Sequence, residues 1–367
     1  MRNRGSHRFQ QIVQLPAVSF LLFIPLLLAQ DTHKTNEPLQ LQVVPPTVYK
    51  VDDPGHGETE SWIFNLVALC GAHDCGLRPV AAAVELYSGS LLVDSQEIAG
   101  PELEKATLTS YRVLADTPAA SARRNFLLNE AFDLRMALSR PKKLGVDRTR
   151  VRLTVANPGG GRKEATVEVT VAVYQQKTAL IFPFRGPGLV MQGWVNDGGH
   201  AGYANQFAVD VLGLDANYAP QTNDKDENTS YAGWDREIIA PADGTVVYAR
   251  NDVPNNPNAN GADEKLLAAQ HDPVLAVAGN CVILDHGNKE FSVMMHMRQG
   301  SVVVKAGEHV KQGDVIGHLG NSGDSFGPHL HYQLQSGPEL FRDPSIPFAF
   351  QNVNRTHLFR GTYFHTK

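Results

Sequence analysis

Charge and cysteine are both scarce in this sequence of 367 residues. Charged residues make up 19% of the chain and hydrophobic residues 42%, a composition that excludes a wholly disordered protein. Subtracting the positive charges of the three arginines among the first ten residues from the net charge of -5 gives -8 for the remainder. Such a chain lacks the basic footprint of a nucleic-acid binder, so no nucleic-acid partner is expected. The length suits two ordinary domains.

The few cysteines fall into a pair and a single residue. Cys70 and Cys75 stand close together, and Cys281 is remote from both. In an oxidising compartment the first two are candidates for a small disulfide; the alternative is two half-buried thiols near a turn. Cys281 begins the apolar run 281–284, which predicts an inert core residue.

The N-terminus has the order of a secretory signal. Three arginines precede the apolar run 15–29, and polar residues follow it. The run is short for a spanning helix and contains two prolines. We therefore predict a signal peptide over residues 1–29, cleaved after Ala29, with an uncleaved membrane anchor as the alternative. No cysteine follows the run, which argues against a lipoprotein. The expected location is the periplasm or the cell exterior.

Short β-type runs dominate the N-terminal half. Residues 30–46 are polar and then proline-rich and are interpreted as a linker, and residues 47–177 as a domain. Within that domain, residues 165–173 alternate between apolar and polar, as a half-buried strand does. The glycine-rich turn 157–161 predicts a hairpin with the run before it. We expect a β-sandwich of immunoglobulin-like size that serves in spacing or docking.

The C-terminal half has a different texture. Over residues 178–350, strand-like pieces are separated by turns rich in Gly, Asn and Asp, so the chain as a whole is expected to be all-β. Two polar insertions, 215–236 and 252–279, are predicted to be surface loops that flank a cleft. Residues 351–367 are interpreted as a C-terminal tail.

His329 and His331 follow a glycine-rich approach, residues 320–328. On a strand, positions two apart share a face at about 3.3 Å per residue, which places the two imidazoles roughly 7 Å apart. Both could bind one metal ion, or one could bind while the other reaches the water on the metal. The alternative is a pair of surface or satisfied core histidines.

A carboxylate and a third histidine stand upstream. Asp210 ends the apolar run 207–210, where a carboxylate is costly unless it is paired or binds a metal. With His200 and His331 it makes a donor set suited to catalytic zinc with an open fourth position. Asp210 could instead cap a neighbouring backbone amide. His296 follows a further apolar run and, taken alone, is more typical of a core.

These residues carry a family resemblance over about residues 180–350. The chain resembles the lysostaphin-type zinc endopeptidases, also called LytM-like or glycyl-glycine endopeptidases. The resemblance implies a compact antiparallel β-core of the duplicated hybrid motif type. It also implies zinc held by His200, Asp210 and His331, with His296 and His329 as catalytic histidines. The stretches that carry it are Gly193…His200…Ala208-Val-Asp210, Ala240-Pro-Ala-Asp-Gly244, Met295-His-Met297 and Gly320-Asn-Ser-Gly…Gly327-Pro-His-Leu-His331.

One spacing departs from the family pattern. The usual first histidine stands four residues before the aspartate, whereas His200 precedes Asp210 by ten. Asn205, which is nearer the usual position, is a poor zinc donor.

The implied mechanism uses histidine as the base. His329 would take a proton from the zinc-bound water, and His296 would stabilise the oxyanion or protonate the leaving amine; these two roles could be exchanged. The helical His-Glu-x-x-His signature, with its glutamate base, is absent.

The resemblance implies a zinc metalloendopeptidase that hydrolyses peptidoglycan stem peptides or cross-bridges. The alternative is a non-catalytic regulator that binds peptidoglycan on the same fold, and a third hypothesis is a lipoyl-like or carbohydrate-binding β-module. The complete donor set favours the enzyme.

Overall fold

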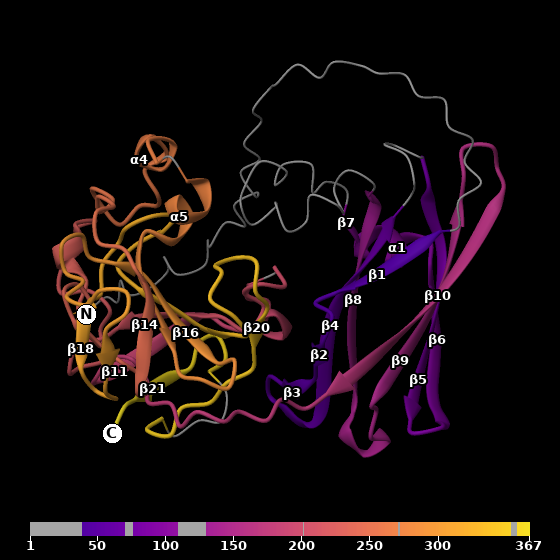
Figure 1. The fold of residues 1–367 in the computed structure, drawn as a ribbon, viewed down its shortest axis with the longest axis horizontal. Helices are drawn as coiled ribbons and strands as arrows, with labels where there is room; N and C mark the ends of the chain where they lie inside the picture. Colours follow the sequence, from indigo (N-terminus) through magenta and orange to yellow (C-terminus); the bar gives the residue numbers. More distant parts are fainter. Residues whose placement is uncertain (1–38, 70–75, 109–129, 201, 271, 354–357) are drawn as a thin grey trace, which may run out of the picture.

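The computed structural model describes residues 39–69, 76–108, 130–200, 202–270, 272–353 and 358–367. Two β-rich halves lie side by side and are joined by the segment that follows residue 172 (Figure 1). The chain is all-β, as predicted. Within the described ranges, no helix has the length and hydropathy needed to cross a membrane. The predicted signal segment and both Cys70 and Cys75 lie outside the described residues.

The N-terminal half contains two five-stranded sheets. The first consists of β1 (Gln40–Val44), β3 (Val51–Asp53), β4 (His56–Leu69), β7 (Thr107–Leu108) and β8 (Glu130–Pro141). The second consists of β2 (Val48–Tyr49), β5 (Arg78–Ser88), β6 (Leu91–Ala99), β9 (Arg148–Ala156) and β10 (Arg162–Ala172). A short helix, α1 (Pro101–Ala106), follows β6.

Alternating apolar residues give these two sheets one shared core. Trp62, Phe64 and Leu66 point inward from β4, while Leu153 and Val155 do so from β9, and all belong to one buried cluster. The predicted hairpin forms around residues 157–161, because Ala156 on β9 pairs with Arg162 on β10. The likeness to an immunoglobulin domain stays a prediction.

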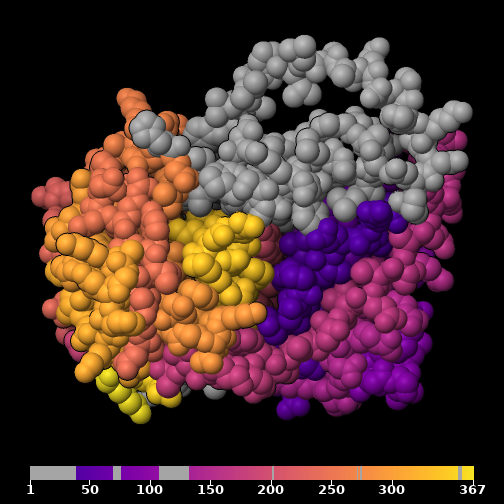
Figure 2. Space-filling model, viewed as in Figure 1, coloured from indigo at the N-terminus to yellow at the C-terminus, as the bar shows by residue number. Residues whose placement is uncertain are grey.

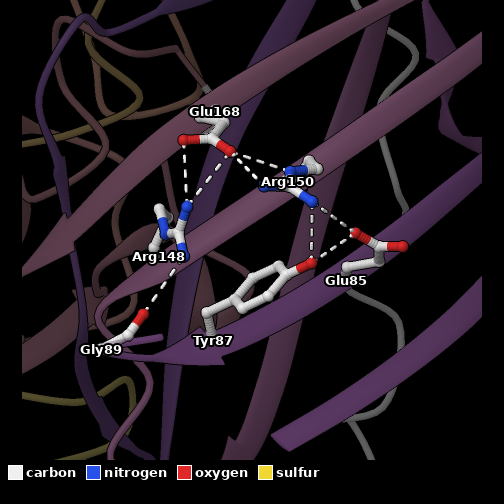
Figure 3. Close-up of polar contacts among 6 residues, drawn as sticks. All are labelled: Glu85, Tyr87, Gly89, Arg148, Arg150 and Glu168. Carbon is white, nitrogen blue, oxygen red and sulfur yellow. Dashed lines mark hydrogen bonds and ion pairs between the residues drawn. The ribbon is translucent and has the colours of Figure 1, made fainter. Parts of the chain in front are cut away.

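The outward face of the second sheet carries an ion-pair network (Figure 3). Glu168 on β10 accepts hydrogen bonds from Arg148 and Arg150 on β9. Arg150 also donates to the Tyr87 hydroxyl of β5 at 2.9 Å. Exposed pairs of this kind contribute at most about 1 kcal/mol each. These charged residues occupy the outward-facing positions of strands whose inward-facing positions form the core.

The C-terminal half is built on a nine-stranded antiparallel sheet. In spatial order its strands are β17 (His309–Val310), β14 (Gly244–Ala249), β15 (Asn280–Asp285), β16 (Phe291–Met297), β19 (Leu330–Gln335), β12 (Val209–Gly213), β11 (Pro187–Gln192) and β21 (Tyr363–His365), with β20 (Ser345–Ile346) also on β19. A separate pair joins β13 (Glu237–Ile239) to β18 (Val315–His318).

The two faces of this sheet bury different side chains. Leu330 and Tyr332 of β19 point into the main core of the half. His331 lies between them in sequence and therefore on the opposite face. There its register partner is Met295 of β16, a member of a second, smaller apolar cluster. The apolar side chains of β19 therefore face the main core, and its polar side chains lie on the opposite face beside the smaller cluster.

Two strands lie in segments that were predicted to be irregular. Within the predicted linker, 30–46, β1 pairs with β4 of the N-terminal half. The predicted tail, 351–367, contains β21, which adds a strand beside β11, and its Phe364 belongs to the main core.

The two polar insertions flank one end of the large sheet. The first contains the 3-10 helix η4 (Asn228–Ser230), and the second contains α4 (Glu264–Ala268) and α5 (Pro273–Ala278). The Asn321 amide joins them by donating to Asn228 Oδ1 and to the carbonyl of Asn258, each at 2.8 Å. This asparagine belongs to the glycine-rich approach that leads to His329.

The two halves touch through specific side chains (Figure 2). Asn196, in the 3-10 helix η3 (Val195–Asp197), donates to the Asp52 carbonyl at 3.0 Å and to Ser61 Oγ at 3.2 Å. Tyr174, which follows β10, packs edge-on against Tyr49 and donates to the buried carboxylate of Glu290 at 2.7 Å. The Asn196 contacts join strands β3 and β4 to the segment that precedes His200.

Candidate metal centre

Three predicted ligands come together between two strands and a loop. Asp210 lies on β12, His331 on β19 and His200 in the loop that follows η3. Their ligand atoms all lie within 4.8 Å of one another. Asp210 Oδ1 is 2.9 Å from His331 Nδ1, and Asp210 Oδ2 is 3.3 Å from His200 Nε2.

The sheet register places two of these residues opposite each other. Asp210 and His331 are direct partners in the antiparallel ladder between β12 and β19, although 121 residues separate them along the chain. Opposed side chains in such a ladder stand about 5 Å apart at Cβ, close enough to share a ligand. Both are buried.

The His200 loop depends on a close backbone approach. A Cβ atom on Gly199 would lie 1.7 Å from the carbonyl oxygen of Gly193, so only glycine fits there. The same carbonyl lies 3.4 Å from His200 Nδ1, which donates to it and leaves Nε2 for the site. This loop allows the ten-residue spacing before Asp210.

The donor set fits zinc. Two ligands about 2.1 Å from one tetrahedral zinc ion lie roughly 3.4 Å apart. The Asp210 carboxylate lies 3.3 Å from His200 Nε2, which matches this spacing, and 2.9 Å from His331 Nδ1, which is shorter. Two imidazoles and one carboxylate are ligands that zinc prefers. Burial opposes ionisation of Asp210, but His200 and His329 outweigh it and hold the pKa of that carboxyl well below its ordinary value. Asp210 is therefore available as an anionic ligand.

Two further histidines complete the cluster. The rings of His296 and His329 are 4.7 Å apart, and His329 Nε2 is 3.6 Å from Asp210 Oδ1. In each ring Nδ1 donates to a backbone carbonyl at 2.8 Å, from His296 to Ser322 and from His329 to Gly327. This bond fixes the tautomer, so Nε2 keeps its lone pair in both rings.

A β-bulge brings His296 to the ligand side of the sheet. Asn280 pairs with Met297 and Val282 pairs with Met294, so β16 has one extra residue against β15. Met294 and Met297 both enter the main core, while His296 has a φ of 62°. A positive φ is uncommon for a residue with a side chain and occurs preferentially at functional sites. Burial, followed by the neighbouring His329 and His331, holds the pKa of His296 well below its ordinary value.

A comparison with known protein families finds a match to part of the C-terminal half. Residues 230–342 match the model of peptidase family M23. The chain carries a peptidase family M23 domain. Three residues of the cluster, His296, His329 and His331, fall inside the matched range, whereas His200 and Asp210 precede it.

Curated relatives resemble parts of this chain. Peptidoglycan DD-endopeptidase ShyA of Vibrio cholerae is 44% identical over 74 residues, which cover 20% of this chain and 17% of ShyA. Peptidoglycan DD-endopeptidase ShyC of the same organism is 36% identical over 98 residues, covering 27% of this chain and 19% of ShyC. The matched part therefore spans less than a fifth of either relative.

Solved structures of two peptidases are also similar to parts of this chain. The catalytic domain of lysostaphin from Staphylococcus simulans is 19% identical, with 45% of this chain and 88% of that chain covered and a TM-score of 0.26. A zinc-containing peptidase from Vibrio cholerae is 13% identical, with 84% of each chain covered and a TM-score of 0.27.

The M23 domain contains two site residues that the sequence analysis missed. Gln333 Oε1 lies 3.1 Å from His331 Nε2, and the half-exposed ring of Phe326 stacks on His329 with centroids 4.7 Å apart. The alternation of β19 could have indicated Gln333, because positions 329, 331 and 333 share a face. The sequence around Phe326 has no comparable period.

Proposed function

We propose that this protein is a zinc-dependent endopeptidase that hydrolyses peptide bonds in peptidoglycan. The observation that supports it most is the convergence of His200, Asp210 and His331 within 4.8 Å, beside two histidines with free Nε2 lone pairs. The M23 domain and the names of the relatives ShyA and ShyC agree with this activity. Peptidoglycan lies outside the cytoplasmic membrane, which accords with the predicted signal segment.

The ligands would be His200 Nε2, a carboxylate oxygen of Asp210 and His331 Nδ1. When bound, zinc would act as a Lewis acid toward the peptide carbonyl and would lower the pKa of a coordinated water. Three protein ligands leave one position of a tetrahedron for the reactants.

His329 is the better placed of the two histidines to carry a proton. Its Nε2 faces the three proposed ligands and lies 3.6 Å from the Asp210 carboxylate. With Nδ1 bonded to Gly327, the ring accepts a proton only at Nε2. It would take that proton from water and then return it from the same nitrogen to the leaving amine.

His296 would serve as a neutral partner. Its lowered pKa keeps it uncharged at neutral pH, and its Nε2 lone pair accepts hydrogen bonds. Such a group can hold an N–H of the substrate in register with the scissile carbonyl. We thus assign proton transfer to His329 and substrate binding to His296, two roles that the sequence analysis left exchangeable.

A non-catalytic regulator on the same fold is the second candidate. A regulator has no need of a metal ligand set or of two free imidazole nitrogens beside it. This chain retains all five side chains in one cluster, which favours catalysis. A carbohydrate-binding β-module would likewise not require this cluster of side chains.

The test combines metal analysis with digestion of cell walls. Purified full-length protein should contain one zinc per chain and release new amino groups from purified sacculi. His329→Ala should keep the metal and lose the release, while His309→Ala, a control at an exposed histidine of β17, should behave as the wild type. Metal-free protein that binds sacculi without releasing amino groups would support the regulator instead.

A further inference from the structure

Strand β19 and the residue before it, His329, present a buried polar stripe on the face that holds the metal ligands. Its four members alternate with apolar residues of the main core, and each is at most 5% exposed. They are His329, His331, Gln333 and Gln335. A buried amide destabilises a fold unless its hydrogen bonds are satisfied, so the partners of the two glutamines are informative.

The hydrogen bonds along this stripe run in one direction. Gln335 Nε2 donates to the Gly337 carbonyl at 2.6 Å, which leaves its Oε1 to accept from Gln333 Nε2 at 2.6 Å. Gln333 Nε2 also donates to the Ala204 carbonyl at 3.1 Å. A backbone carbonyl only accepts, so both amide orientations are determined by their partners.

The direction of these hydrogen bonds determines which ring nitrogen of His331 carries the proton. With its Nε2 engaged, Gln333 turns Oε1 toward His331 Nε2 at 3.1 Å. An oxygen acceptor requires a proton on that nitrogen. The other nitrogen of the neutral ring, Nδ1, then carries the lone pair and faces Asp210 Oδ1 at 2.9 Å. Two acceptors at this distance call for a cation between them.

We propose that Gln333 is a positioning residue for the metal, holding His331 in the Nε2–H tautomer that offers Nδ1 to zinc. This inference rests on the proposed zinc site and adds the group that orients one of its ligands. Partners of this kind commonly contribute 10- to 100-fold to metal affinity.

Gln333 also connects two ligand-bearing segments. Ala204, whose carbonyl accepts from the amide, lies between His200 and Asp210 in sequence. One side chain therefore contacts His331 directly and the His200 loop through its backbone. Loss of the amide removes both contacts together.

Three variants of the full-length protein separate this role from general packing. Gln333→Met keeps the length of the side chain without the acceptor, and should raise the zinc dissociation constant by about 10- to 100-fold. Gln333→Glu keeps an acceptor for His331 but loses both donor bonds of the amide, so it should bind zinc more tightly than Gln333→Met and more weakly than the wild type. Gln335→Met, the matched control, leaves the contact between Gln333 and His331 and should also stay within about threefold.

The readouts are zinc affinity by chelator competition, denaturant unfolding of the metal-free proteins and imidazole ¹⁵N shifts of zinc-loaded protein. In the wild type, His331 should carry zinc on Nδ1 and a proton on Nε2, and Gln333→Met should show a mixed population with zinc on either Nδ1 or Nε2. Equal losses of affinity in Gln333→Met and Gln335→Met, or zinc on Nε2 in the wild type, would overturn the positioning role. A wild type that binds no zinc would instead overturn the proposed function from which it starts.

Discussion

Asp210 and His331 face each other on adjacent antiparallel strands, with Oδ1 and Nδ1 2.9 Å apart. The Nε2 nitrogen of the same ring forms a hydrogen bond with Gln333 Oε1. The carboxylate and the imidazole lone pair thus converge on one point, which His200 approaches from the other carboxylate oxygen. A single divalent ion, as proposed above, would satisfy all three groups.

Asp210→Asn should abolish tight zinc binding. The amide removes the only negative charge among the three ligands, so we expect the dissociation constant to rise by more than about 100-fold. Chelator competition on purified protein measures this. Asp215→Asn is the matched control, because Asp215 is only partly buried and its carboxylate bonds the nearby backbone amides of Asn217 and Ala219. Equal zinc affinity in Asp210→Asn and the wild type would rule out Asp210 as a ligand.

His329→Ala should separate catalysis from metal binding. In the proposed mechanism this imidazole transfers a proton and does not bind the metal, so kcat should fall by about 10²- to 10⁴-fold while zinc affinity stays near that of the wild type. Release of amino groups from sacculi by zinc-loaded protein provides the rate. A fully loaded variant with kcat close to that of the wild type would assign the proton transfer to another group.

Gly199→Ala should disrupt the His200 loop. The new methyl would collide with the Gly193 carbonyl, and we expect a loss of about 2–4 kcal/mol in the free energy of unfolding together with weaker zinc binding. Gly198→Ala has open space and only a positive φ to accommodate, at about 1 kcal/mol. Denaturant unfolding of both variants makes the comparison. Similar values for the two would contradict the close approach described for Gly199.

His286 should make stability depend on pH. Burial lowers its pKa, against the opposing effects of the Asp243 carbonyl and the nearby Asp285, Glu290 and Asp243 charges. Because the folded-state pKa lies below the unfolded value near 6.5, the contribution of His286 is complete above about pH 6.5 and is lost as the pH falls toward the folded pKa. Its neutral ring bonds the Asp243 carbonyl and Ser292 Oγ.

The measurement is the urea midpoint at pH 7.5 and pH 5.5 for the wild type and for His286→Asn. The drop between the two pH values should be smaller in the variant. An identical drop in both proteins would mean that His286 has the same pKa in the folded and unfolded states.

Cys281 should be inert toward thiol reagents in the folded protein. The residue is fully buried on β15, and burial raises the pKa of its thiol to about 12, so almost no thiolate exists at neutral pH. Peptide mapping after alkylation should find Cys281 modified only in denaturant. Modification at equal rates in native and unfolded protein would contradict the core position.

Regular alternation made much of this fold predictable. Residues 165–173 and the run after His329 alternate cleanly, and the structure forms strands β10 and β19 there. The same period of two put His329 and His331 on one face. The short strand β21 was not predicted, since its three residues are too few to distinguish a strand from a turn and depend on pairing with β11.

Local alternation could not predict which distant residues would meet at the site. The pairing of Asp210 with His331 is a tertiary register across 121 residues, and local sequence does not encode it. The bulge at His296 places a non-glycine residue at positive φ within an apolar run, a conformation that propensity disfavours. Family resemblance, rather than local pattern, supplied the expectation that these residues act together.

X-ray absorption at the zinc edge on purified full-length protein tests the shared metal site most directly. The account predicts one zinc per chain, with a first shell of nitrogen and oxygen ligands at about 2.0–2.1 Å and an imidazole contribution from two histidines. A chain that retains no zinc, or a sulfur shell at about 2.3 Å, would contradict it.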